Sequence, residues 1–159
     1  MYNYNNYNDI ASQTGAGLAL AGGLIILLVI MGIALGVFMI ITYWKLFKKA
    51  GRNGWESLIP YYNMWVLNSI ANAHWMWYMA LVVGTLGVSS DDSGITSMAY
   101  ALVVFAQIVV GINVAKKFGK STGFGVLCVL LPFIGYPILA FGSAEYDESV
   151  KVSEHGVTD

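Results

Sequence analysis

The chain has 159 residues, of which 57% are hydrophobic and 11% are charged, whereas a soluble domain is about 45–50% apolar and about 25% charged. Its formal net charge of −1 excludes a broad basic field for nucleic acid, and its single cysteine excludes an intramolecular disulfide or a multi-thiolate metal site. A chain with so few charges cannot cover itself with polar surface in water, so the composition favours an integral membrane protein.

The N-terminal region combines a polar tail with a long apolar run. Residues 1–16 are rich in Tyr and Asn, a low-complexity composition that predicts disorder. The uncharged run of about 25 residues at 17–41 can cross the hydrocarbon layer, which takes about 20 residues, and it is longer than the core of a cleavable signal peptide. Tyr43 and Trp44 then fall at headgroup depth. A first basic cluster follows, made of Lys45, Lys48, Lys49 and Arg52.

The middle of the chain, residues 57–90, carries no Lys, Arg, Asp or Glu and admits two interpretations. A second basic cluster lies beyond it, made of Lys116, Lys117 and Lys120. Two crossings would place the basic clusters on opposite sides of the membrane, against the positive-inside rule, whereas one crossing keeps both in the cytoplasm. We therefore predict one span at residues 74–88, preceded by an interfacial amphipathic helix at residues 57–72.

Two further runs complete the predicted spans. Residues 95–115 and residues 123–141 are each apolar over about the length that crosses a bilayer. The last run contains Pro132 and Pro137, and two prolines in one spanning helix predict that it is kinked or partly unwound.

The sequence thus predicts an all-α polytopic membrane protein with four transmembrane helices and one interfacial helix. The transmembrane domain covers residues 17–142, and a polar tail follows at residues 143–159. With the basic turns in the cytoplasm, both termini are expected to be extracytoplasmic.

Few side chains inside the predicted spans point to chemistry. We assign no catalytic group, metal-ligand cluster or cofactor motif. Gln107 and Asn113 are polar groups within the third span, and we interpret them as interhelical hydrogen-bonding groups, with the lining of a path as the alternative. Small residues recur at a spacing of four, which indicates close packing within the bundle or a homodimer seam. The pairs are Gly32 and Gly36, Ala80 and Gly84, and Gly111 and Ala115.

Several short motifs carry a resemblance to a known family. They are Gly54-Trp55, Ile59-Pro60-Tyr61-Tyr62-Asn63, Phe118-Gly119-Lys120-Ser121 and the closing Tyr136-Pro137-Ile138-Leu139-Ala140-Phe141-Gly142. Together they resemble an uncharacterised prokaryotic family of small membrane proteins, in which a similar domain is sometimes joined to a type I signal peptidase. The resemblance covers about residues 43–146. It implies a prokaryotic cytoplasmic (inner) membrane and no particular activity.

Two of these motifs adjoin the basic clusters, so the predicted topology brings them together on the cytoplasmic face. The candidate interaction patch consists of Arg52, Trp55, Tyr61, Asn63, Lys117 and Lys120. The alternative is that these residues are only topology signals and interfacial anchors.

Three functional hypotheses follow. The leading one is a non-enzymatic scaffold or accessory subunit of a membrane complex, in protein export or envelope processing, with another membrane protein or a second copy of the chain as partner. The second is a small transporter or channel, motivated by the interrupted last span together with Gln107 and Asn113. The third is binding of anionic lipids by the patch, beyond the bilayer contact that every span makes.

Overall fold

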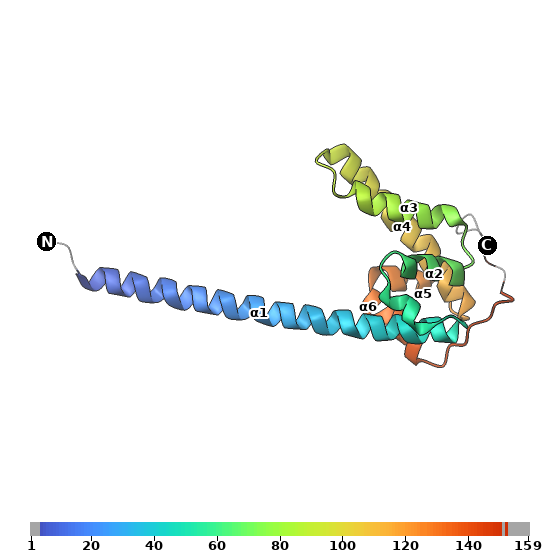
Figure 1. Ribbon diagram of the computed structural model, residues 1–159, viewed down its shortest axis with the longest axis horizontal. Coiled ribbons are helices and arrows are strands. Elements are labelled where there is room, and N and C mark those ends of the chain that lie inside the picture. The colour runs from blue at the N-terminus through green and yellow to red at the C-terminus, as the bar shows by residue number, and fades with distance from the viewer. Residues whose placement is uncertain (1–3, 151, 153–159) are drawn as a thin grey trace. The chain divides into compact units, whose positions relative to one another are not determined.

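The computed structural model describes residues 4–150 and residue 152, with side chains from residue 20 onward. Every regular element within these residues is a helix (Figure 1), which confirms the all-α fold class. The elements are α1 (Tyr4–Lys49), the 3₁₀-helix η1 (Gly54–Leu58), α2 (Tyr62–Ile70), α3 (Trp75–Gly87), α4 (Ser93–Lys117), α5 (Thr122–Leu130) and α6 (Pro132–Phe141). The chain forms two compact units, which divide within α1 after Phe38.

The first unit is the N-terminal part of α1. The helix begins at Tyr4, inside the stretch expected to be a disordered tail, because extending an existing helix by a further turn costs little. Its apolar side chains from Leu20 onward are exposed, and a Cβ placed on Gly32 or Gly36 would meet nothing within 4 Å. Within this unit, which is one helix, Gly32 and Gly36 thus have no packing contact, and the predicted Gly32–Gly36 seam stays a prediction.

Among the described residues, two helices are long and apolar enough to cross a membrane. They are α1, in its part Leu20–Lys49, and α4. Helix α3 has 13 residues, which rise about 20 Å against the roughly 30 Å of a hydrocarbon layer. The structure therefore supports a membrane protein and two of the four predicted spanning helices.

The predicted fourth span is two helices and not one kinked helix. Pro132 is the first residue of α6, where its missing N–H costs nothing. Gly135 lets α6 fold against α5, because a Cβ there would lie 2.6 Å from the Cα of Cys128. Pro137 stays inside α6. The helix breaks near the prolines, as predicted. The break, however, turns α6 back onto α5 as a tight helical hairpin instead of kinking a single spanning helix.

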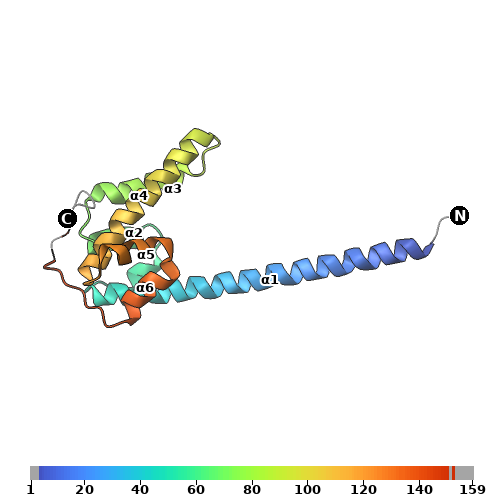
Figure 2. The same cartoon turned by 180° about the vertical axis from the view of Figure 1, so that it is seen from behind.

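Close backbone approaches hold α3, α4 and α5 together in the second unit. A Cβ on Gly84 of α3 would lie 2.4 Å from a methyl group of Val103 in α4, and one on Gly125 of α5 would lie 2.4 Å from the Cα of Ile112. Helices α3 and α4 lie side by side in both views (Figure 2). The small residues thus pack within this unit.

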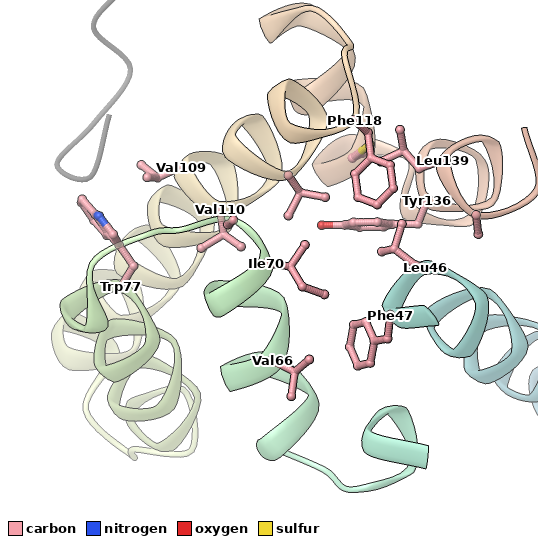
Figure 3. Close-up of a cluster of buried hydrophobic side chains, with 14 of the residues drawn as sticks. Leu46, Phe47, Val66, Ile70, Trp77, Val109, Val110, Phe118, Tyr136 and Leu139 are labelled. Carbon is pink, nitrogen blue, oxygen red and sulfur yellow. The ribbon is translucent and has the colours of Figure 1, made fainter. Parts of the chain in front are cut away.

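The core of the second unit lies between the end of α1, α2, α4 and α6 (Figure 3). Its largest buried apolar side chains include Leu46, Phe47, Val66, Ile70, Phe118, Tyr136 and Leu139. The predicted interfacial helix at 57–72 corresponds to the last residues of η1 and to α2, with Leu58 and Tyr62 exposed, and its place at a membrane interface stays a prediction. Its apolar residues Val66 and Ile70 are buried against protein, because helix periodicity shows that a face is apolar without showing what covers it.

The segment after α6 returns to the basic end of α4. The backbone N–H of Asp147 donates to the carbonyl oxygen of Lys117 over 2.9 Å, and the Lys117 Nζ donates to the carbonyl oxygen of Glu148 over 2.8 Å. This pairing is at odds with the expectation that the C-terminal tail and the basic turns face opposite compartments.

Candidate functional site

The loop between α1 and α2 is built on tightly packed inward-facing residues. Gly54 lies on the ring of Trp44, and a Cβ there would come within 2.4 Å of that ring. Glu56 is 4% exposed, and its Oε2 accepts a hydrogen bond from the Arg52 Nε at 3.2 Å, which also makes an ion pair. The Ser57 hydroxyl donates to the Gly54 carbonyl oxygen over 2.8 Å. Buried contacts therefore fix the backbone of η1.

The same loop turns large apolar and aromatic side chains outward. We call this surface the η1 ridge, and it consists of Trp55, Leu58, Ile59 and Tyr61. The exposed fractions run from 43% for Ile59 to 54% for Leu58. Trp55 is stacked on Tyr62, with ring centroids 6.4 Å apart. The ridge therefore presents apolar surface from a fixed backbone.

Tyr61 has an unusual backbone conformation. Its φ is +62° and its ψ is −40°, and the N–H of Tyr62 donates to the carbonyl oxygen of Pro60 over 2.7 Å. This is a γ-turn with positive φ, a rare and strained geometry. Such strain costs about 1–3 kcal/mol and is concentrated at functional sites. The conformation holds the exposed Tyr61 ring at the end of the ridge.

The residues of the predicted interaction patch come from two segments of the structure. Arg52, Trp55, Tyr61 and Asn63 lie together in the η1 loop and the first turn of α2. The two lysines lie at the end of α4 and the turn after it. The described residues show no hydrogen bond, ion pair or ring contact between these lysines and those four residues. The single patch remains a prediction.

The Lys117 side chain is buried and hydrogen-bonded within the protein. It is 2% exposed and donates to the C-terminal segment, so it is not presented to lipid. Lys120 is half-buried, and its N–H caps the end of α4 by donating to the carbonyl oxygen of Ala115 over 2.8 Å. These contacts weaken the case for an anionic-lipid site at this turn.

Two further contacts fix the C-terminal segment. The Tyr146 hydroxyl donates to the carbonyl oxygen of Ile70 over 3.3 Å, and its ring lies 5.5 Å from that of Phe118. Burial and, to a smaller extent, the Glu148 carboxylate raise the pKa of Tyr146, so the hydroxyl stays protonated and able to donate. Hydrogen bonds from Ser149 lower the pKa of Asp147 and keep its carboxylate charged.

Asn113 and Gln107, the two polar residues of the predicted third span, differ from each other in burial. Asn113 is 2% exposed, in the buried part of α4. Gln107 lies on an outer face of α4 and lines a cavity of about 320 Å³ together with Tyr43 and Tyr136. Sequence reasoning missed this cavity, because its walls come from six helices and no local pattern marks them.

Comparison with known proteins places the chain in a family. A profile of DUF5684, a family of unknown function, matches residues 55–149, which include the η1 ridge, the α5–α6 hairpin and the C-terminal segment. No curated protein and no solved structure matches the chain. The prokaryotic origin and the link to signal peptidases remain predictions. The family profile covers more than half of the sequence, and the chain therefore belongs to DUF5684.

Proposed function

We propose that this protein is a non-catalytic accessory subunit of a membrane complex and that it docks a partner protein through the η1 ridge. The observation that carries the proposal is the combination of exposed Trp and Tyr side chains with a backbone fixed by buried contacts and strained at Tyr61. Trp and Tyr dominate binding energy at protein interfaces. A fixed backbone lowers the entropy cost of binding.

Interfacial anchoring is the competing use of exposed aromatic residues. Aromatic anchors at headgroup depth work from ordinary helix ends, so they do not call for a strained γ-turn or a buried Glu56. The fusion of similar domains to type I signal peptidases, which the sequence resemblance implies, makes the export and envelope-processing machinery the first place to look for the partner.

The test compares capture of a partner by full-length variants after in-cell cross-linking and detergent purification. Trp55→Ala is expected to reduce capture about tenfold or more, since central aromatic anchors contribute about 2 kcal/mol or more. Trp75→Ala is the matched control, because Trp75 lies at the start of α3, outside the ridge, and is 59% exposed against 49% for Trp55.

A second variant separates binding from folding. Tyr61→Gly removes the ring and relieves the strained φ, so it should raise the melting temperature while it weakens capture. Equal capture by Trp55→Ala, Tyr61→Gly and wild type would show that the ridge does not dock a partner.

We also propose a topology for this fold. Helix α1 crosses once, α2 and α3 together lead back across, α4 crosses again, and the α5–α6 hairpin enters and leaves on the same side. The basic ends of α1 and α4 then face the cytoplasm. The contact of Asp147 with Lys117 supports a cytoplasmic C-terminal segment, with the N-terminus outside.

Cysteine labelling in intact cells tests this topology. In a Cys128→Ser background, a cysteine at Ser149 should react with a membrane-impermeant maleimide only after the cells are opened. A cysteine at Ser90, in the turn between α3 and α4, should react in intact cells. Labelling of Ser149→Cys from outside would refute the proposed return of the hairpin.

A further inference from the structure

A cavity of about 320 Å³ lies within the second unit, lined by one to three side chains from each of its six α-helices. This volume is at the lower end of the range for small-molecule sites, about 300–1,000 Å³. Its buried floor includes Leu81, Val110 and Cys128. The walls are mainly apolar, and none of the described residues that line it is charged.

Three polar side chains on this cavity lack hydrogen-bond partners. They are the hydroxyls of Tyr43 and Tyr136 and the amide of Gln107, none of which bonds to any described residue. Tyr136 is only 6% exposed, and its ring lies 5.3 Å from that of Tyr43. Figure 3 shows the Tyr136 side chain reaching from α6 toward Val110 and Ile70. These polar groups are therefore open to the cavity and available to a ligand that accepts hydrogen bonds.

The accessible side of the cavity is apolar. Phe133, on its wall, is 51% exposed, and its neighbours Leu131 and Ile134 are about as exposed. These residues lie at and just after the turn between α5 and α6. The nine residues of α5 separate this turn from the basic cluster at the end of α4. In a membrane this side meets lipid chains, so a lipid can enter laterally.

We propose that the cavity binds a neutral lipid whose apolar chain carries a carbonyl oxygen. The apolar walls take the chain, and the absence of charge on the lining disfavours an ionic headgroup. The Tyr hydroxyls and the Gln107 amide are the groups on the lining that can donate to the carbonyl oxygen, which accepts up to two hydrogen bonds. An ester carbonyl of a diacylglycerol and a ring carbonyl of an isoprenoid quinone both present this chemistry.

Cys128 provides a direct reporter. It is the only cysteine in the chain, it is fully buried, and its side chain lines the cavity. A ligand in the cavity should therefore slow its modification by N-ethylmaleimide, a small uncharged reagent that can enter from the lipid side.

The experiment uses the full chain, delipidated in detergent and exchanged into lipid nanodiscs. The probes are dioctanoylglycerol, decylubiquinone and dodecane, the last of which lacks oxygen. At least one oxygen-bearing probe should slow Cys128 modification about tenfold and raise the melting temperature, and the probe that does so identifies the source. Protection by neither oxygen-bearing probe, or equal protection by dodecane, would overturn the proposal.

Two variants test the hydrogen bonds. The double variant Gln107→Leu, Tyr136→Phe keeps the size of the cavity and removes polar groups, so the affinity for the protecting probe should fall about tenfold. Tyr100→Phe is the matched control, because Tyr100 is an exposed residue of α4 away from the cavity. If the double variant is folded, with Cys128 as slow to react as in the wild type without a probe, an unchanged affinity for the protecting probe would also overturn the proposal.

Discussion

Replacing Gly125 by alanine is expected to disrupt the packing of α5 on α4 and to lower the free energy of unfolding by about 3 kcal/mol. The added Cβ would lie 2.4 Å from the Cα and 2.9 Å from the backbone N of Ile112. Backbone atoms inside a helix cannot rotate away as the end of a flexible side chain can. The two helices must separate, which also opens the nearby contact between Gly111 and Val129.

The matched control for this variant lies one half-turn earlier in the same helix. A Cβ on Gly123 would meet only the Ser121 Oγ, at 4.0 Å, so Gly123→Ala should be neutral or slightly stabilising. Both variants can be compared by denaturation in detergent, followed by far-UV circular dichroism and Cys128 accessibility. Equal stability of Gly125→Ala and wild type would show that α4 and α5 are not in close backbone contact.

The spanning helices were the most predictable part of the fold. Uncharged runs such as residues 17–41 and residues 95–115 predicted helices long and apolar enough to cross a membrane, and the structure has such helices at Leu20–Lys49 and Ser93–Lys117. Proline chemistry also marked the break in the last run, because Pro132 cannot donate a backbone hydrogen bond. Whether a proline kinks a helix or starts a new one depends on the partner, and Gly135 against Cys128 decides this only in three dimensions.

The candidate site was predictable only where it is local in sequence. Arg52, Trp55 and Tyr61 lie within ten residues of one another, so their proximity in one loop followed from the motif. The assignment of Lys117 to the same surface relied on charge alone. Its contact with Glu148 spans 31 residues of sequence, and no composition or periodicity encodes a contact at that separation.

The positive-inside rule predicts a cytoplasmic position for Lys49, and the structure shows which groups its side chain contacts. Its Nζ donates to the carbonyl oxygens of Leu139 at 2.9 Å, Gly142 at 2.6 Å and Ala144 at 3.1 Å. These groups lie at and just after the end of α6, where helix carbonyls lack partners and carry partial negative charge. The lysine of α1 thus caps α6 and ties the hairpin to the end of α1.

Lys49→Met is therefore expected to lower the free energy of unfolding by about 2–3 kcal/mol, because hydrogen bonds to a charged donor are each worth about 1.5–3 kcal/mol and Lys49 is partly exposed. Methionine retains most of the length of the side chain, so packing of the stem is preserved. The loss should appear as a lower denaturation midpoint and as faster proteolysis after Phe141, where the chain leaves α6.

Lys48→Met provides the comparison, because it removes the same charge from the adjacent position. The Lys48 Nζ lies 5.9 Å from the centroid of the Trp44 ring, a contact worth about 0.5–1 kcal/mol at an exposed site. A topology signal depends on the number of positive charges and should respond alike to either substitution. If Lys49 caps α6, Lys49→Met should lower the free energy of unfolding more than Lys48→Met does. Equal losses of stability in the two variants would show that Lys49 acts only as a topology signal.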